Sequence, residues 1–364
     1  MEKYRREYQG ISFLIAMKQA SKSLINFAGE GRDFKVEGSI IRTLQSIDER
    51  DIGHVELYGG RTVYTLTEIL EYEDRWIGHS DDLLARVNGL VTLLNRSDIT
   101  EGLPLLKCRN FYHIPERRAL GLIYEIPRSV DSPNTAPEPI TLANFIAKTQ
   151  KRQDRPILED IFLVAYKIAS SVGTFHQAGW FHKAISASTI LFFPVSGNAL
   201  QNAISKLYIV GFNHSQEDGQ DAITVGPPKD RALHDYQHSE YSRSHSTVGF
   251  GEEFEYYSVG IVLLELCRWK ALRHTTKKLG NRDSSPEELR SQLLDQEIPH
   301  LGSYMGGTYM SATKACLDGS LKAESSERSR SLFREKVVQP LEKCLVLCCY
   351  KGSNEGLEYL VFVS

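Results

Sequence analysis

Two short stretches of the sequence hold side chains that could do chemistry. In "GWFHKAISASTILFF" (179–193), His182 could act as a general base and Lys183 could contact a phosphate group. A second group, in a turn-rich loop, consists of three potential metal ligands: His234, Asp235 and His238. A packed histidine, a structural lysine contact and a solvated loop are the more common outcomes for such residues. The surrounding pattern therefore has to decide whether either stretch is a site.

The stretch around His182 has the spacing of the protein-kinase catalytic loop, H-R-D-L-x-x-x-N. In that loop the aspartate takes the proton of the substrate hydroxyl and the asparagine holds a metal ion. Here the same frame reads His182, Lys183, Ala184 and, after the intervening residues, Thr189. The spacing is kept without a gap, but Ala184 has no carboxylate and Thr189 has no amide.

A second frame begins seventeen residues after Thr189, in "KLYIVGFNHS" (206–215). Kinases carry the magnesium motif Asp-Phe-Gly there. Alignment on Phe212 places Gly211 at the metal-binding aspartate and Asn213 at the terminal glycine. Asparagine tolerates a left-handed backbone better than most residues, so the turn can persist while the metal ligand cannot.

Two further segments follow in the order found in kinases. "YQHSEY" (236–241) stands where kinases carry Ala-Pro-Glu, with Glu240 at the glutamate. "EFEYYSVGIVLLEL" (253–266) resembles the buried kinase helix that opens Asp-x-Trp-Ser-x-Gly, with Glu255 at the aspartate. A helix that is hydrophobic nearly all round is stable only inside a core.

The elements that must position these frames are predicted by periodicity. The glycine-separated stretches "HVELYGG" (54–60) and "RTVYTLTEIL" (61–70) indicate a hairpin. An amphipathic helix is predicted at 80–95, a second strand pair at 110–127 and a long helix at 157–177. The order is hairpin, helix, hairpin, Pro-rich linker, then mostly helix, which is the order of a two-lobed kinase.

Across residues 60 to 345 the chain resembles a protein kinase domain with a degraded active site. The quoted phrases are most similar to the kinase-like domain of filamentous-fungal prion-inhibition and propagation proteins, of the heterokaryon-incompatibility type. The resemblance implies an α+β, two-lobed kinase-like fold with a small antiparallel-sheet lobe and a larger, mainly helical lobe. The expected parts are an N-terminal helical extension, the small lobe, the large lobe and an irregular tail: 1–45, 46–127, 128–345 and 346–364.

Within these parts, a helix is expected at 11–28, where it could be the remnant of a helical domain. "SSERSRS" (325–331) is expected to be a polar linker. Cys348 and Cys349 could be lipidated, but the sequence supplies no polybasic second signal beside them.

The resemblance implies nine motif positions and leaves no catalytic one intact: His182, Lys183, Ala184, Thr189, Gly211, Phe212, Asn213, Glu240 and Glu255. Other kinase features are missing as well. The phosphate-covering G-x-G-x-x-G is absent, and only Gly59–Gly60 lie in the right region. Residues 65–76 should hold the phosphate-binding lysine. They contain no lysine, and their one arginine, Arg75, lies near the end of the stretch. The helix offers Val87 or Asn88 near the expected glutamate.

These losses decide the expected chemistry. Loss of a positioned base alone costs about 10²–10⁴ in rate, and the ligands of the magnesium ion are lost with it. We therefore expect no metal site and no magnesium, and ATP binding that is weak if it occurs. The expected function is a regulatory or protein-binding module in fungal signalling. The alternative is an atypical ATP-dependent protein kinase, a serine/threonine-type phosphotransferase that uses non-standard residues.

Composition narrows the expected partners. The formal net charge of −3 gives no bulk positive field for nucleic acid, and apolar runs such as 261–266 are too short to span a bilayer. The six cysteines form no C-x-x-C pair, which suits a reducing cytosol. We expect a cytoplasmic protein with a protein partner. Membrane association is expected only through a missing or remnant N-terminal domain.

Overall fold

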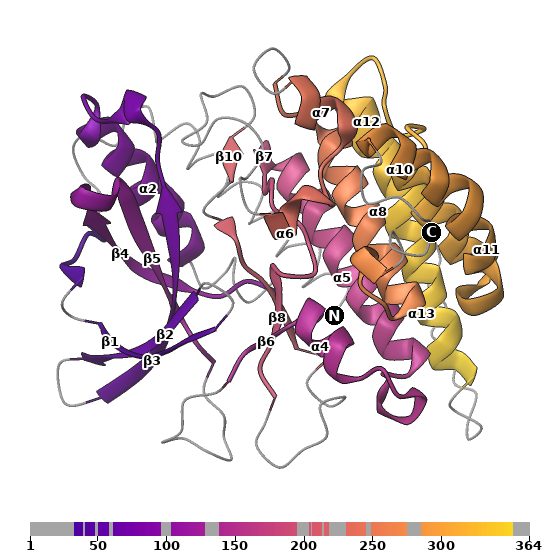
Figure 1. Cartoon of the computed structure of the whole chain (residues 1–364), viewed down its shortest axis with the longest axis horizontal. Coiled ribbons are helices and arrows are strands. Elements are labelled where there is room, and N and C mark those ends of the chain that lie inside the picture. Colours follow the sequence, from indigo (N-terminus) through magenta and orange to yellow (C-terminus); the bar gives the residue numbers. More distant parts are fainter. Residues whose placement is uncertain are drawn as a thin grey trace, which may run out of the picture.

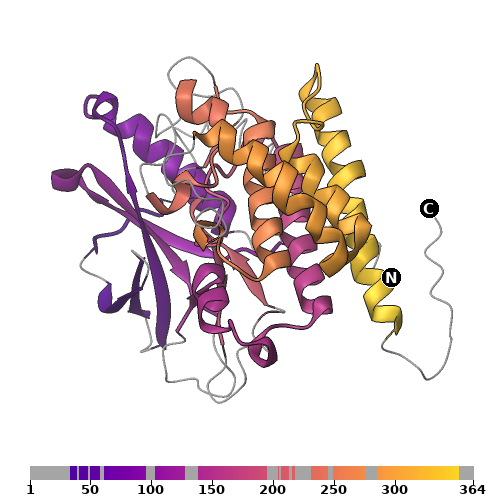
Figure 2. The ribbon, with the colours of Figure 1, turned by 45° about the vertical axis from the view of Figure 1, so that its right-hand side comes forward.

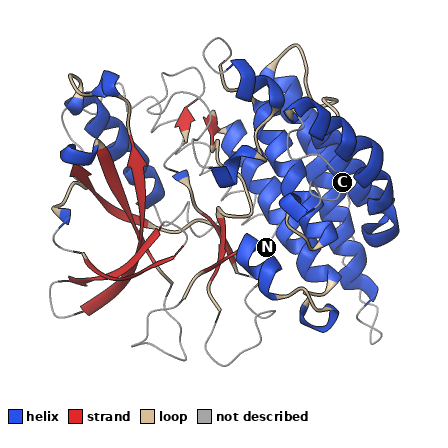
Figure 3. Cartoon of the chain, viewed as in Figure 1, coloured by secondary structure: helices blue, strands red, loops and turns tan. Residues whose placement is uncertain are grey.

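A computed structural model describes residues 33–38, 41–47, 50–57, 61–95, 103–127, 138–194, 204, 206–212, 215–217, 231–244, 249–274 and 285–351. The chain has an α+β fold in which an N-terminal, five-stranded antiparallel sheet is followed by a mainly helical region. Figures 1 and 3 show the sheet at one end of the molecule and the helices at the other. This arrangement is consistent with the two lobes that were predicted.

The large sheet has the strand order β1-β2-β3-β5-β4, and all its neighbours are antiparallel. Its strands are β1 (Arg42–Ile47), β2 (Arg50–Leu57), β3 (Arg61–Glu71), β4 (Cys108–Ile114) and β5 (Ala119–Glu125). The predicted pairings of β2 with β3 and of β4 with β5 are confirmed. The 3₁₀ turn η3 (Pro115–Arg117) joins β4 to β5, with Arg118 in the left-handed region at φ 49°. Strand β1 was not predicted, and it begins ahead of the expected boundary at 46.

Helix α2 (Ser80–Asn95) covers one face of this sheet and has the predicted bounds. The residues with their side chains buried against the core are Leu83, Val87, Leu90, Val91, Leu93 and Leu94. The amide of Asn95 donates to the carbonyl of Cys108 at 2.8 Å, which ties the end of the helix to the start of β4. Between β3 and α2 lies the short helix η2 (Asp74–Trp76). Arg75 therefore lies beyond the strand and not on it.

Two small sheets lie between the large sheet and the helices (Figure 1). One pairs β6 (Ile140–Thr141), β8 (Ile190–Phe192) and β9 (Leu207–Ile209), and the other pairs β7 (Trp180–Phe181) with β10 (Gln216–Glu217). The backbone N–H of Ile209 also donates to the carbonyl of Pro104 at 2.7 Å. This bond connects β9 to the segment that leads into β4.

The helical region is built around α8 (Glu252–Arg268), with the later helices packed beside it (Figure 2). The other helices are α4 (Leu142–Lys148), η4 (Arg152–Asp154), α5 (Leu158–Gln177), α6 (Arg231–His234), α7 (Ser239–Ser244), α10 (Pro286–Gln292), η7 (Leu293–Glu297), α11 (Ile298–Leu317), α12 (Ser326–Phe333), η8 (Arg334–Val338) and α13 (Gln339–Lys351). Val259, Val262 and Leu263 are fully buried, which confirms that α8 is a core helix. At Gly260 an added Cβ would lie 2.8 Å from Leu317, so the absence of a side chain lets α8 and α11 approach closely.

Two expectations about the C-terminal region need correction. Residues 325–331 are not a linker, because α12 begins there and the hydroxyl of Ser325 accepts from the backbone N–H of Arg328 as an N-cap. Helix α13 runs to Lys351, past the expected start of the irregular tail at 346. The predicted helix at 11–28, most of the Pro-rich linker expected at 127–139 and residues 352–364 lie outside the described residues. In the ranges that the structure describes, no helix is both long and apolar enough to cross a membrane.

Candidate functional site

The pairing of β8 with β9 brings the two predicted motif frames together. The loop 182–189 connects β7 to β8, and β9 leads directly to Gly211. Ile190 pairs with Ile209, and the N–H of Val210 donates to the carbonyl of Thr189 at 2.9 Å. Two segments that were predicted separately therefore form one site.

The buried carboxylate of Glu255 on α8 anchors the loop. Its Oε1 accepts from the backbone N–H of Lys183 at 2.7 Å, and its Oε2 accepts from that of His182 at 3.3 Å. Oε2 also lies 2.6 Å from Nε2 of His176 on α5. Burial alone would raise the pKa of Glu255, but the His176 hydrogen bond, both histidine charges and the Lys183 N–H outweigh it and hold the pKa below its ordinary value. Glu255 thus anchors the loop through its backbone N–H groups.

Thr189, at the position of the metal-binding asparagine, is used to close the loop on itself. Its Oγ1 accepts from the backbone N–H of Ser186 at 3.0 Å and donates to the carbonyl of Ala184 at 2.8 Å. Ala184, at the position of the base, is buried and offers only a methyl group. The hydroxyl of Thr189 is therefore used within the loop, and Ala184 has no polar side-chain group.

Gly211, at the position of the metal-binding aspartate, has a backbone that other residues adopt only under strain. Its φ is +96°, and an added Cβ would lie 2.7 Å from Cγ2 of Thr189. The position therefore requires glycine, both for its backbone angle and for the space beside Thr189. A carboxylate cannot be present there without rearrangement of the loop.

Phe212 and His182 have a packing role, and for His182 this is the more common outcome named in the sequence analysis. Both side chains are buried, and their ring centroids lie 4.6 Å apart in an edge-to-face contact. Phe175 on α5 packs against both rings. Burial lowers the pKa of His182, although the charges of Glu255 and Glu68 oppose that shift, so the imidazole is neutral near pH 7. These rings form an apolar seam and not an acid–base pair.

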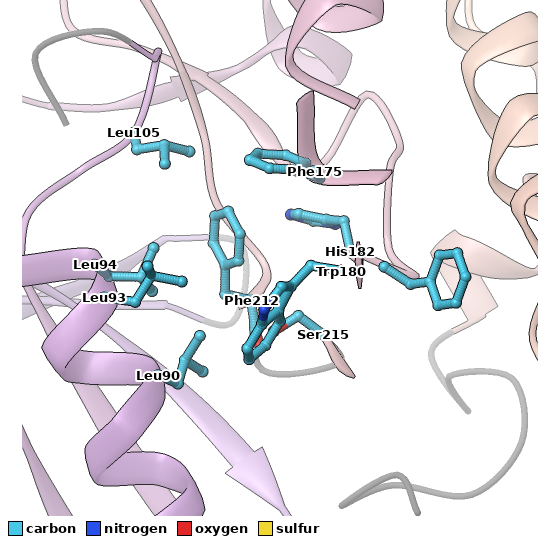
Figure 4. A pocket seen from close by; sticks show the side chains of 10 residues that line it. Leu90, Leu93, Leu94, Leu105, Phe175, Trp180, His182, Phe212 and Ser215 are labelled. Carbon is cyan, nitrogen blue, oxygen red and sulfur yellow. The ribbon is translucent and has the colours of Figure 1, made fainter. Parts of the chain in front are cut away.

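A small hollow lies beside this seam, between α2 and β7 (Figure 4). Its volume is about 10 Å³, which is room for about one water molecule. Most of its lining is apolar: Leu90, Leu93, Leu94, Leu105, Phe175, Trp180, Phe181 and Phe212, with His182 and Ser215. Its size and lining do not resemble a site for a nucleotide.

Lys183 turns away from the loop and toward the helical region. Its φ is +67°, and its Nζ lies 5.6 Å from the ring centroid of Phe250 and 6.0 Å from that of Tyr241 on α7. Ammonium groups are attracted to aromatic faces at such distances. Lys183 therefore makes the structural contact that was one of its two predicted roles.

The remaining motif positions add no chemical group to the site. Glu240 on α7 lies near the surface, with an oxygen 3.9 Å from Nζ of Lys322. Asn213 and the pair Gly59–Gly60 lie outside the described residues. Val87, at the expected helix glutamate, is buried, and Asn88 accepts from the backbone N–H of Phe34 at 2.9 Å. None of the described side chains in this group reaches Gly211.

Two charged residues that the motif frames did not include do reach the site. Arg50, at the start of β2, donates from Nε to Oε1 of Glu68 on β3 at 2.7 Å and from a terminal nitrogen to the carbonyl of Ser188 at 3.1 Å. The other oxygen of Glu68 accepts from the backbone N–H of Gly211 at 2.9 Å. A carboxylate from the sheet thus meets the backbone at the residue that the motif frame aligns with the magnesium-binding aspartate.

The sequence contained a signal for Glu68. Side chains on a strand alternate between its faces, so Glu68 lies on the same face as Leu66 and Leu70, both of which are buried. A charged residue on a buried face needs a partner. Arg50 gave no such signal, because it lies in the charged stretch "DERD" (48–51).

The comparisons with known proteins identify a family and give no activity. A family model described as a domain of unknown function (DUF7580) matches residues 113–348. The match begins within β4 and ends within α13, so it includes both motif frames and the whole of α8. No curated protein matches the chain.

Proposed function

The chain belongs to the family of the domain DUF7580, and we propose that it is a kinase-shaped domain without phosphotransfer activity. On this proposal it acts as a regulatory or protein-binding module in fungal signalling, in the cytoplasm, with a protein as its partner. The kinase likeness rests on the order of the elements and on the motif spacing. The strand order, the position of α2 and the meeting of the two frames at β8 and β9 support it.

One observation is the main support for the proposed absence of phosphotransfer activity. The positions of the base and of the two metal ligands lie together, and they are filled by a methyl group, a self-bonded hydroxyl and a glycine: Ala184, Thr189 and Gly211. Phosphoryl transfer depends on positioning and on compensation of phosphate charge. Arg50 does bring a positive charge to this point, but the carboxylate of Glu68 pairs with it, so the pair offers a polyphosphate no net compensating charge.

The parts that support shape are retained while the reactive groups are replaced. Glu255 anchors the loop, and His182 and Phe212 pack together inside the core. This combination favours selection for a surface and not for a reaction, because a protein-binding role needs the lobes to be held in place. Lys183 fits the same interpretation, since it contacts aromatic rings of the helical region.

The alternative, an atypical kinase, is supported by one observation. Strand β3 has no lysine, but Arg50 on β2 brings a guanidinium to the site. Guanidinium groups bind phosphates well. In the structure, however, Glu68 already neutralises that charge. A phosphate group would have to displace a carboxylate that is almost fully buried.

Incubation of the purified chain with γ-labelled ATP tests the proposal. We expect no incorporation into the chain or into generic protein substrates, with either magnesium or manganese, and a thermal shift on ATP addition that is small and the same with and without metal. The matched variant is Ala184→Leu, checked for folding by circular dichroism. Metal-dependent incorporation that Ala184→Leu abolishes would establish the atypical kinase instead.

A further inference from the structure

The ion pair of Arg50 and Glu68 connects the sheet to two separate points of the loop region. Arg50 reaches the carbonyl of Ser188, just before Thr189. Glu68 reaches the N–H of Gly211, just after β9. Each partner therefore makes one bond to the other and one bond to backbone outside the sheet.

Both side chains are shielded from solvent. Their exposed fractions are 12% for Arg50 and 3% for Glu68. Removal of one partner from a buried ion pair leaves an uncompensated charge, which is far more costly than the loss of an exposed pair. Hydrogen bonds to charged groups are also among the stronger ones in proteins. The pair can thus hold the sheet against the loop with no ligand between them.

The geometry gives these bonds a direction. A guanidinium can donate to the carbonyl of Ser188 but cannot accept, and a carboxylate can accept from the N–H of Gly211 but cannot donate. An exchange of the two residues would keep their mutual attraction and lose both bonds to the loop. The arrangement therefore differs from a simple ion pair that happens to be buried.

We propose that Arg50 and Glu68 form a latch that holds the two lobes together in the absence of nucleotide, in the space where a kinase places phosphates and metal. This proposal rests on the proposed function in one respect: the comparison of this space with the nucleotide site of a kinase. The contacts of the latch stand whether or not the protein transfers phosphate. In kinases a bound nucleotide bridges the lobes, whereas here the chain's own charges make the bridge.

Backbone amide exchange in the full chain tests the latch at the N–H groups of Val210 and Gly211. The variants are Arg50→Gln, Glu68→Gln, the double variant and the exchanged pair Arg50→Glu with Glu68→Arg. The matched control is Arg109→Gln, because Arg109 pairs with Glu125 between β4 and β5 within the sheet. Exchange in α8, which lies in the core, reports global unfolding and is used to separate it from local opening.

We expect Gly211 to exchange about tenfold faster in each single variant, after correction for global unfolding, because a charge-assisted hydrogen bond is lost or weakened. The double variant should be no faster than the singles, since both changes open the same contact. The exchanged pair should not restore protection, and Arg109→Gln should leave Gly211 unchanged. Small-angle scattering should show a larger radius of gyration for Arg50→Gln.

Unchanged exchange at Gly211 in Arg50→Gln, effects that multiply in the double variant, or recovery in the exchanged pair would each overturn the latch. The labelled-ATP assay on the unmodified chain is read separately. Incorporation of labelled phosphate would contradict the proposed function. The latch would then still be tested by amide exchange at Gly211.

Discussion

Gly211 and Thr189 pack so closely that a Cβ on Gly211 would lie 2.7 Å from Cγ2 of Thr189. The two residues stand at the positions of the two metal ligands expected from the motif frames. Their contact means that the site is shaped around the absence of a side chain. Return of a carboxylate to position 211 would require Thr189 to move, and Thr189 holds the loop together.

We predict that Gly211→Ala destabilises the protein by about 2–4 kcal/mol, from the strain of a positive φ together with the clash against Thr189. Urea unfolding measures the change. Gly179→Ala is the matched control, because Gly179 has a φ of +79° and nothing within 4 Å of the added Cβ. It should cost only the backbone strain, about 1–2 kcal/mol. Addition of Thr189→Ser, which removes Cγ2 and keeps the hydroxyl, should recover part of the Gly211→Ala loss; equal losses at both glycines would contradict the clash.

Phe212→Ala should destabilise the protein by about 3–5 kcal/mol, because it removes a buried ring from the contacts with His182 and Phe175. Denaturant unfolding followed by tryptophan fluorescence measures the loss. Phe212→Leu keeps most of the apolar volume and should cost clearly less. A smaller loss of stability in Phe212→Ala than in Phe212→Leu would show that the ring does not stabilise this packing.

Ala184→Asp should not produce kinase activity, because the metal position at Gly211 would still be without a ligand. It should also destabilise the protein by about 1–3 kcal/mol, since it places a polar group in a buried position. Labelled-ATP incorporation and thermal unfolding are the two measurements. Ala184→Ser, of similar size and uncharged, is the control. Metal-dependent transfer by Ala184→Asp would mean that a second ligand exists in the cleft.

Glu265 on α8 should make the stability fall as the pH rises through the weakly acidic range. Burial raises the pKa of Glu265 from 4.5 to about 7, although hydrogen bonds from Leu272 and Tyr236 oppose the shift. Between these two values the folded state keeps a proton that the unfolded chain has lost, so the free energy of unfolding decreases with rising pH.

Gln at this position stays neutral, so Glu265→Gln should remove that decrease. The stability of Glu265→Gln relative to the unmodified protein should therefore increase from pH 4.5 to pH 7, by about 3 kcal/mol at most. Urea unfolding at several pH values gives the difference. A difference that stays constant across this range would show that Glu265 is ionised at the lower pH in the folded state.

The elements with a strong local pattern could be predicted from the sequence, and those stabilised mainly by distant contacts could not. Helix α2 was predicted from apolar residues along one face, and helix α8 from apolar residues on nearly all its faces. The spacing of the motif frames located the loop and Gly211. Helix α12 is polar in sequence. It is held by the ring of Phe333, whose centroid lies 4.1 Å from that of Tyr256, and by the hydroxyl of Ser329, which donates to Leu321. Nothing local marks those partners.

The candidate site shows the same division. The two motif frames could be located in the sequence by counting, and the structure brings them together at β8 and β9. Arg50 could not be assigned, because its role depends on the pairing of β2 with β3 and on the approach of the sheet to Ser188. Glu68 was open to prediction as a charge on a buried face, but its partner was not.

The bonds from Arg50 to Ser188 and from Glu68 to Gly211 join residues 138 and 143 positions apart in the chain. Contacts of such sequence separation form late, because a long segment of chain must be ordered before they can close. The contact between the sheet and the loop is therefore not expected on a half-folded chain. A partner that recognises the surface around it would bind only molecules whose folding is complete.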